Sequence, residues 1–138
     1  MATSEPILRV LCVDDNRDAA DTLGVLLELF GYHSRVCYDG FSALEVAEEF
    51  RPDAAILDLS MPGMEGDDLG RRLRATDWGR SLPLVALTAL SGEEARERTA
   101  AAGFDLHLVK PVNPDRLANV LADIVILRGE SDPSTSSD

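Results

Sequence analysis

Residues 54–66, with the sequence AAILDLSMPGMEG, hold the clearest structural signal in the chain. The first four residues are apolar, which indicates a strand buried on both faces, as in parallel sheets covered by helices on either side. The run ends in Asp58, and a loop rich in proline and glycine follows at once. An isolated aspartate at such a place is most often a turn former or a helix cap. The meaning of Asp58 therefore depends on which groups the other strands place beside it.

Short apolar runs alternate with helical patterns along the rest of the chain. Strands are predicted at 7–13, 34–38, 54–58, within 82–90 and at 106–110. Helices with one apolar face, or with helix-forming composition, are predicted at 18–30, 41–50, 67–75, 93–102 and 114–127. An alternation of strand and helix repeated in this way predicts an α/β fold, in which right-handed crossovers cover both faces of a parallel sheet.

The length of 138 residues fits one compact domain. We expect the folded part to span 7–128, after a short N-terminal extension at 1–6. The segment 129–138, with the sequence GESDPSTSSD, has the polar composition of a disordered tail.

The formal net charge is -12 and the sequence pI is about 4.4. This balance argues against direct binding of nucleic acid or of anionic membranes, since both need clustered Lys and Arg. It is compatible with a solvated acidic surface or with a concentrated cation site. Cys12 and Cys37 lie within apolar runs and are predicted to be buried thiols. Because no signal peptide or membrane-spanning run is recognisable, we expect a cytoplasmic protein.

Chemically capable side chains stand at the carboxyl ends of four predicted strands. Open parallel sheets bind ligands outside these ends. The first strand is followed by Asp14 and Asp15, the third ends in Asp58, the fourth reaches Thr88 and the fifth ends in Lys110. Each residue has an ordinary structural explanation when taken alone. Their joint occurrence at one edge of the sheet favours a functional site.

The three aspartates would repel one another unless a cation lay among them. Carboxylate ligands without His or Cys nearby suit Mg²⁺. A carboxylate beside Mg²⁺ can attack phosphorus and hold the phosphoryl group as an acyl phosphate. The oxygens of the transferred group need positive charge and donors, which Lys110 and the hydroxyl of Thr88 could supply. Asp58 is the best candidate nucleophile, because it lies on a central strand and precedes a loop that could admit a donor.

Four motifs, in this order and on these elements, resemble the receiver domain of two-component response regulators. They are VDD (13–15), LDLSMPGMEG (57–66), LTA (87–89) and VKP (109–111). The resemblance covers about 7–127. It implies a three-layer flavodoxin-like (βα)5 sandwich of one domain, with a five-stranded parallel sheet in the order 2-1-3-4-5.

The resemblance also implies a set of acceptor and metal roles. Asp58 would be the phosphoacceptor. Asp15 would bind Mg²⁺ directly, and Asp14 would do so directly or through water. Asp58 and the backbone carbonyl of Ser60 would complete the protein ligands, with Mn²⁺ able to replace Mg²⁺.

Further roles concern the phosphoryl group and its signal. By resemblance, Lys110 contacts the phosphoryl group and its peptide bond to Pro111 is cis. Thr88 moves toward the phosphoryl oxygen and signals to the face of the fourth helix, fifth strand and fifth helix. The donor would be the phosphohistidine of a histidine kinase or of a phosphotransfer protein, and the target an unknown protein. The chain would be a signalling protein with self-catalysed phosphotransfer and slow autodephosphorylation, present as a monomer or as a weak dimer through the same face.

One position departs from the usual pattern of the family. Three residues before the lysine the family commonly has Tyr or Phe, whereas this chain has His107. An imidazole can still rotate inward, but it is smaller and titrates near neutral pH. His107 is therefore either a switch residue or a partly exposed strand residue without that role.

Other protein classes fit the residues less well. A phosphatase of the haloacid dehalogenase type needs a second aspartate where Ser60 stands. A flavodoxin needs a phosphate loop in place of DDNR (14–17), and a dinucleotide-binding domain needs the G-x-G-x-x-G motif, which is absent. A pseudo-receiver that is not phosphorylated would be expected to lack part of the site.

A choice within the family stays open. The segments VDDNRDAADTL (13–23) and WGRSLPL (78–84) are more typical of receivers attached to hybrid histidine kinases. Met1 and the polar tail favour a complete small protein. The chain is thus predicted to be a stand-alone regulator or a receiver taken from a hybrid kinase or a longer regulator.

Overall fold

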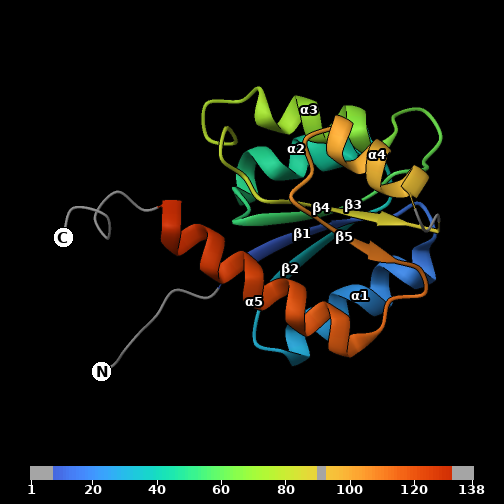
Figure 1. The fold of residues 1–138 in the computed structure, drawn as a ribbon. Helices are drawn as coiled ribbons and strands as arrows, with labels where there is room; N and C mark the ends of the chain where they lie inside the picture. Colours follow the sequence, from blue (N-terminus) through green and yellow to red (C-terminus); the bar gives the residue numbers. More distant parts are fainter. Residues whose placement is uncertain (1–7, 90–92, 132–138) are drawn as a thin grey trace.

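The computed structural model describes residues 8–89 and 93–131. Within these ranges strands and helices alternate along the chain (Figure 1). The strands are β1 (Arg9–Val13), β2 (His33–Cys37), β3 (Ala54–Asp58), β4 (Leu84–Thr88) and β5 (Leu106–Val109). The helices are α1 (Arg17–Leu29), α2 (Gly40–Phe50), α3 (Gly66–Arg74), α4 (Glu93–Ala101) and α5 (Pro114–Ser131).

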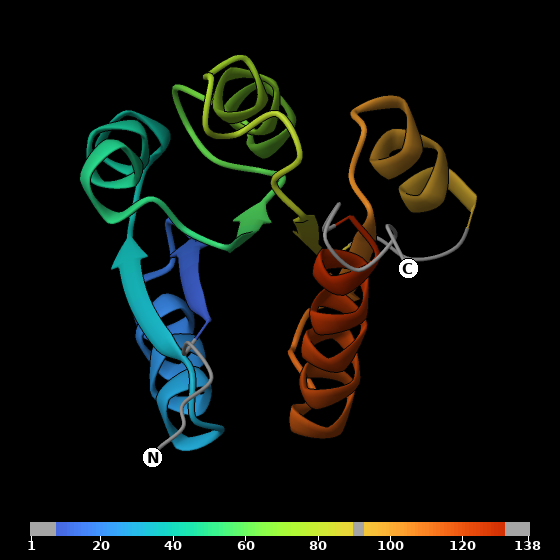
Figure 2. The ribbon, with the colours of Figure 1, turned by 90° about the vertical axis from the view of Figure 1, so that its left-hand side faces the viewer.

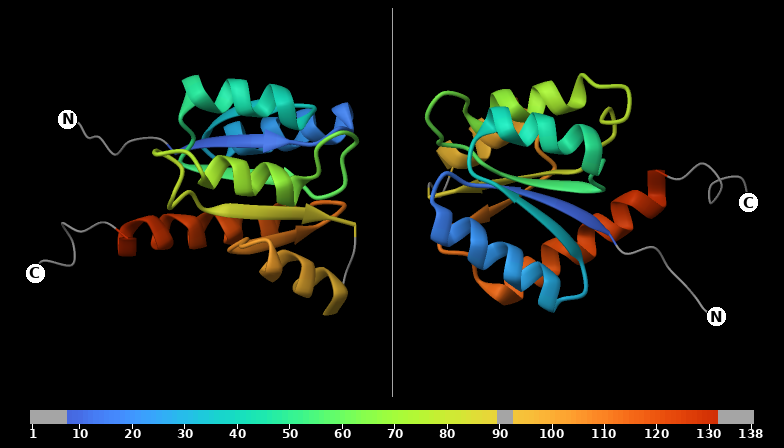
Figure 3. Two further views of the ribbon diagram at one scale, coloured as in Figure 1. Left: turned by 90° about the horizontal axis from the view of Figure 1, so that it is seen from above. Right: turned by 180° about the vertical axis from the view of Figure 1, so that it is seen from behind.

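All strand pairs are parallel, and the order across the sheet is β2-β1-β3-β4-β5. Helices α2, α3 and α4 cover one face of the sheet, whereas α1 and α5 cover the other (Figures 1 and 2). The predicted three-layer flavodoxin-like fold is therefore confirmed. The strand arrowheads point to the same end of the molecule, which Figure 3 shows from above and from behind.

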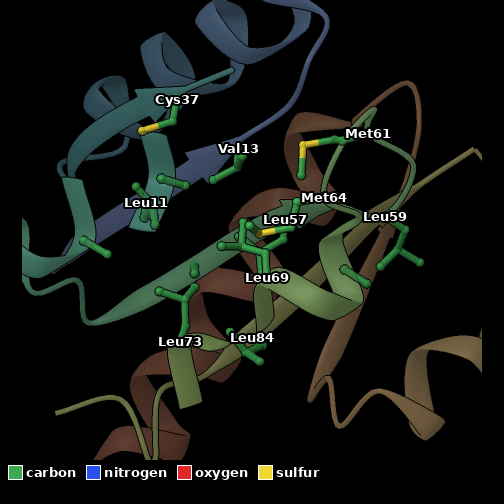
Figure 4. Close-up of a cluster of buried hydrophobic side chains, with 14 of the residues drawn as sticks. Leu11, Val13, Cys37, Leu57, Leu59, Met61, Met64, Leu69, Leu73 and Leu84 are labelled. Atoms are coloured by element: carbon green, nitrogen blue, oxygen red, sulfur yellow. The ribbon is translucent and has the colours of Figure 1, made fainter. Parts of the chain in front are cut away.

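The central strands contribute side chains to two separate hydrophobic cores, because successive side chains of a strand point to opposite faces of the sheet. In β3, Leu57 packs toward α2 and α3, while Ile56 packs toward α1 and α5. Both side chains are fully buried. Figure 4 shows the first core, in which Met61 and Met64 of the loop after β3 join the leucines of the sheet. This packing anchors the loop that follows Asp58.

Polar caps fix where the first two helices begin. The side chain of Asn16 accepts the N–H of Ala19 at 3.0 Å and caps α1. The side chain of Asp39 accepts the N–H of Ser42 at 2.7 Å and caps α2. Because Asn16 caps α1, the carboxylate of Asp15 has no part in that cap. Both helices thus start next to the carboxyl edge of the sheet.

The last helix is longer than the sequence analysis expected. It was predicted to end at 127, but α5 continues to Ser131. Gly129 lies within this extension, and a helical glycine costs only about 1 kcal/mol, which is too little to end an established helix. The tail was expected at 129–138, but residues 129–131 belong to α5. The expected extension at 1–6 and the remaining part of the expected tail, 132–138, lie outside the described residues. In the described part of the chain, no helix is both long enough and apolar enough to cross a membrane.

Candidate functional site

The carboxyl edge of the sheet brings together the side chains that the sequence singled out. Parallel strands end at the same edge, so β1, β3, β4 and β5 deliver their terminal residues to one place. Within the described residues, Asp14, Asp15 and Asp58 each place a carboxylate oxygen within 4.8 Å of the other two. Lys110 forms ion pairs with two of these three carboxylates.

Two of the three carboxylates are buried. Asp14 is fully buried and Asp58 is 2% exposed, whereas Asp15 is exposed. Backbone donors orient the buried pair: the N–H of Asn16 donates to Oδ1 of Asp14 at 3.0 Å, and the N–H of Ser60 donates to Oδ1 of Asp58 at 3.1 Å. The second oxygen of Asp58 is thus left to face the site.

Lys110 links the two buried carboxylates. Its Nζ lies 3.2 Å from Oδ2 of Asp58 and 3.2 Å from Oδ2 of Asp14. The backbone N–H of Lys110 donates to the carbonyl of Thr88 at 2.8 Å, which ties the lysine to the end of β4. The peptide bond between Lys110 and Pro111 is cis, the isomer that the resemblance implied.

The electrostatics of the site favour an additional cation. Burial raises the pKa of Asp58 to about 7, and the neighbouring Asp14 adds to this effect, while the N–H of Ser60 and the charge of Lys110 oppose it. Burial alone would lower the pKa of Lys110, but its contacts with Asp14 and Asp58 outweigh burial and raise it. One ammonium group therefore does not fully neutralise the cluster of carboxylates.

The side chains present fit a hard divalent cation. Oδ2 of Asp14 is buried and, among the described residues, has no hydrogen-bond partner, although Lys110 lies near it. Lys110 is the cation that pairs with this oxygen, and Asp14 shares it with the buried Asp58. Asp14, Asp15 and Asp58 offer only oxygen ligands, the kind that Mg²⁺ prefers. The contribution of the Ser60 carbonyl stays a prediction.

Thr88 and His107 lie on neighbouring strands beside this cluster. Thr88 is buried at the end of β4. His107 is half-buried in β5, opposite Ala86 of β4. These positions agree with a switch that runs from the site toward β5. The switching roles of both residues stay predictions.

A cavity of about 540 Å³ opens beside the site. Its walls come from α1 and from residues 110–112, and its lining includes Asp14, Leu26, Leu87 and Lys110. The cavity therefore reaches Asp14 and Lys110 of the site from the side of α1.

Arg98 was not singled out from the sequence, yet it reaches the loop that follows Asp58. It lies in α4, and its Nη2 donates to the backbone carbonyl of Leu59 at 3.0 Å and to Oε1 of Glu65 at 2.9 Å. The only sequence signal was an arginine in a charged helix without a clear apolar face. Its partners lie more than 30 residues earlier in the chain, so no local pattern could identify them.

The comparison with protein families assigns the chain to a class. The sequence model of the response regulator receiver domain matches residues 10–122. The chain therefore belongs to the family of response regulator receiver domains, a signalling family of two-component systems.

Curated relatives support this assignment. The response regulator MprA of Mycobacterium leprae (strain TN) is 36% identical over 131 residues, which make up 95% of this chain and 55% of the relative. MprA of Mycobacterium ulcerans (strain Agy99) is 39% identical over 104 residues, or 75% of this chain and 44% of the relative. The chain thus spans about half the length of these relatives.

Solved structures share the fold. The chemotaxis protein CheY4 of Vibrio cholerae matches with a TM-score of 0.82 and 30% identity, over 86% of this chain and 99% of that one. The receiver domain of sensor histidine kinase PA1611 from Pseudomonas aeruginosa matches with a TM-score of 0.78 and 31% identity, over 87% and 98% of the two chains. The PA1611 receiver was solved with a magnesium ion coordinated in its active-site cleft.

Proposed function

We propose that this chain accepts a phosphoryl group on Asp58 from the phosphohistidine of a histidine kinase or of a histidine phosphotransfer protein. The observation that carries the proposal is the placement of Asp58. Its Oδ1 accepts the N–H of Ser60, while its Oδ2 lies 3.2 Å from the ammonium group of Lys110, in a cluster of three carboxylates. A nucleophilic oxygen is thereby held beside positive charge at the carboxyl edge of the sheet.

The chemical step is an in-line displacement at phosphorus. The free oxygen of Asp58 forms a bond to phosphorus as the bond from phosphorus to the imidazole nitrogen of the donor breaks, and the imidazole leaves with the electron pair. Lys110 is placed to pair with the phosphoryl oxygens, and the hydroxyl of Thr88 is the expected further donor. The N–H of Ser60, which already faces Asp58, can remain in contact with the product. Attack by water on the acyl phosphate would account for slow autodephosphorylation.

Asp14, Asp15 and Asp58 would hold Mg²⁺, with the Ser60 carbonyl as the expected fourth protein ligand and Mn²⁺ as a substitute. When bound, the ion supplies positive charge that offsets the repulsion among the carboxylates and between them and the incoming phosphoryl group. The two buried carboxylates of Asp14 and Asp58, which share one ammonium group, support this assignment.

The signal would leave the site through α4, β5 and α5. Thr88 and Lys110 are linked by a backbone hydrogen bond, so a change at the phosphoryl group can reach β5 directly. His107 would be the aromatic part of this switch. The regulated partner would be a protein that docks on this face, with the chain acting as a monomer or a weak dimer. The free thiols of Cys12 and Cys37 agree with the cytoplasmic location that we propose.

A relay role within a larger kinase is the second candidate. The PA1611 neighbour is the receiver domain of a sensor histidine kinase, whereas the MprA relatives are response regulators that are about twice as long as their match to this chain. In either setting the chemistry at Asp58 would be the same. A pseudo-receiver, acting only by binding, is the alternative that lacks this chemistry.

The test is to incubate the protein with acetyl phosphate, with and without Mg²⁺, and to weigh it intact beside an Asp58→Asn variant. We expect a gain of one phosphoryl group that requires both Mg²⁺ and Asp58. No gain in the presence of Mg²⁺ would overturn the proposal and favour the pseudo-receiver.

A further inference from the structure

Arg98 connects α4 to the loop that follows Asp58. Its guanidinium group binds two groups of this loop and one group at the start of α3. Nη2 donates to the carbonyl of Leu59 at 3.0 Å and to Oε1 of Glu65 at 2.9 Å, and Nε and Nη2 each donate to a carboxylate oxygen of Asp67 at 3.3 Å. A guanidinium group suits this task, because its donors point in fixed directions.

The contact with Leu59 is the important one for Asp58. The carbonyl of Leu59 and the N–H of Ser60 belong to the same peptide group. Arg98 binds the carbonyl end of that group, while its N–H end donates to Oδ1 of Asp58 at 3.1 Å. The positive charge of the guanidinium group, next to the carbonyl oxygen, polarises the peptide group and makes its N–H a stronger donor. A single peptide group therefore links the guanidinium group of Arg98 to the carboxylate of Asp58.

The same peptide group is held firmly from other directions. The carbonyl of Leu59 also accepts the N–H of Gly66 at 3.1 Å, and the N–H of Leu59 donates to the carbonyl of Leu87 at 3.0 Å. Leu59 is fully buried. In contrast to these backbone contacts, the contact from Arg98 comes from α4, on a separate part of the fold.

The ion pair that accompanies this contact is partly shielded from solvent. The side chains of Arg98 and Asp67 are 28% and 20% exposed, whereas Glu65 is 63% exposed. Burial alone would raise the pKa of Asp67, but the hydrogen bond and charge of Arg98, together with the backbone N–H of Asp67 and the charge of Arg71, outweigh burial and lower the pKa. Arg98 is thus paired at neutral pH, and Asp67 holds it over the Leu59 carbonyl.

We propose that Arg98 is a positioning residue for phosphoryl transfer to Asp58, acting through the peptide group between Leu59 and Ser60. Through the same contact, a change in that peptide group alters the position of α4. Arg98 would therefore couple the state of Asp58 to α4, independently of the route through Thr88. The kinetic part of this inference rests on the proposed phosphorylation of Asp58, whereas the orientation of the peptide group does not.

The first experiment measures the Ser60 amide in the full chain, labelled with ¹⁵N and free of divalent ions. We expect Arg98→Met to speed exchange of this amide with water by about fivefold, the effect of losing one ordinary hydrogen bond. The matched control is Arg72→Met, because Arg72 forms a surface pair with Asp68 in α3 at 3.3 Å. The control should leave the Ser60 amide unchanged. Unchanged exchange in Arg98→Met would overturn the inference, whatever the outcome of phosphorylation.

The second experiment follows phosphorylation by acetyl phosphate at saturating Mg²⁺. We expect Arg98→Met to slow it by about fivefold, while the Mg²⁺ affinity stays within about twofold of the original protein. Asp67→Asn removes the charge partner but keeps the contact with Leu59, so it should slow the reaction less. An equal effect of Asp67→Asn would overturn the inference in favour of a general role in anchoring α4.

A conservative variant keeps the test decisive if Arg98→Met does not fold. Arg98→Lys retains the charge but cannot reach Leu59, Glu65 and Asp67 together. It should slow phosphorylation more than Asp67→Asn and less than a fully truncated side chain. If it matches the original protein in both the rate and the Ser60 amide, the positioning role is refuted. A wild-type chain that takes up no phosphoryl group would instead refute the proposed function, with the amide measurement still able to test Arg98.

Discussion

At the scale of single residues, the site holds more negative charge than its one lysine can offset. Asp14 and Asp58 are buried beside each other, and Lys110 touches both. Burial and the neighbouring carboxylate hold the pKa of Asp58 at about 7 instead of its ordinary 3.8. This arrangement therefore lowers the stability of the metal-free protein, while it suits the binding of a cation and a phosphoryl group.

Asp58→Asn should stabilise the metal-free protein against unfolding. A carboxyl whose folded pKa exceeds its unfolded pKa binds its proton more tightly in the folded state, so the original protein loses stability as the pH rises from about 4 to about 7. We expect the variant to gain about 1 to 3 kcal/mol near neutral and higher pH, and the gain to vanish toward about pH 4. Urea unfolding in the presence of a chelator at several pH values measures this difference. A variant that is less stable than the original at all pH values would mean that the ion pair with Lys110 outweighs burial.

Lys110→Met should separate metal binding from phosphoryl transfer. Removing the ammonium group leaves the carboxylates more strongly repelled, so Mg²⁺ binding should tighten. Phosphorylation should slow by about 100-fold, because the phosphoryl oxygens lose a fixed positive charge. Calorimetric titration and intact mass spectrometry measure the two effects. A slower reaction together with weaker Mg²⁺ binding would instead assign Lys110 to the support of the metal site.

The location of the site was predictable at this scale, but its supporting contacts were not. Asp14, Asp15, Asp58 and Lys110 each lie at the end of a short strand or directly after it, so the topology alone placed them together. The proposed role of Arg98 depends on contacts with Leu59, Glu65 and Asp67, which lie more than 30 residues earlier in the chain. Such contacts follow from how the helices pack and not from any local pattern.

At the scale of elements, the loop from β3 to α3 is packed directly against the end of β3. The N–H of Gly66 donates to the carbonyl of Leu59 at 3.1 Å. A Cβ atom on Gly66 would lie inside the contact distance of the backbone carbonyl of Asp58. The start of α3 can therefore approach Asp58 only because residue 66 has no side chain.

Gly66→Ala should destabilise the protein by about 2 to 3 kcal/mol, since the backbone of Asp58 cannot move aside without disturbing β3. Gly70→Ala, also in α3, is the matched control. Its Cβ would meet the end of the flexible Leu84 side chain at 3.2 Å, and the gain in helix propensity of about 1 kcal/mol would offset that contact. Urea unfolding measures both variants. Equal stabilities of the two variants would show that the close approach at Gly66 is not a constraint.

The positions of the helices and strands were predicted well where the polar and apolar patterns were strong. They were predicted less well at the C-terminal end of α5. Caps such as Asn16 and Asp39 have side chains suited to helix starts, and the buried runs marked the strands. The end of α5 was predicted too early, because the segment 129–138 has the polar composition of a disordered tail. Helix propagation from the buried face of α5 carried the helix into this segment.

At the scale of the whole molecule, a strongly acidic chain concentrates three carboxylates at one edge of its sheet. The net charge of -12 attracts cations in general, but the cluster of Asp14, Asp15 and Asp58 should bind one of them specifically.

Mg²⁺ should therefore raise the thermal stability of the whole domain. With the free ion at about ten times its dissociation constant, the gain is about 1.4 kcal/mol. Scanning calorimetry measures the shift, with sodium chloride at equal ionic strength as the control for screening. The variant Asp15→Asn, which changes an exposed ligand, should lose most of the gain. An equal gain in Asp15→Asn, or with sodium chloride alone, would mean that the ion acts on the general surface charge.

The central claim is that Asp58 itself carries the phosphoryl group, and the most direct measurement locates the modified residue. Protein treated with acetyl phosphate and Mg²⁺ is reduced with borohydride, which converts an aspartyl phosphate into homoserine, and is then digested and sequenced by tandem mass spectrometry. We predict homoserine at position 58 and at no other aspartate. Homoserine at Asp14 or Asp15, or at no position after a confirmed gain of phosphoryl mass, would contradict the assignment of Asp58 as the acceptor.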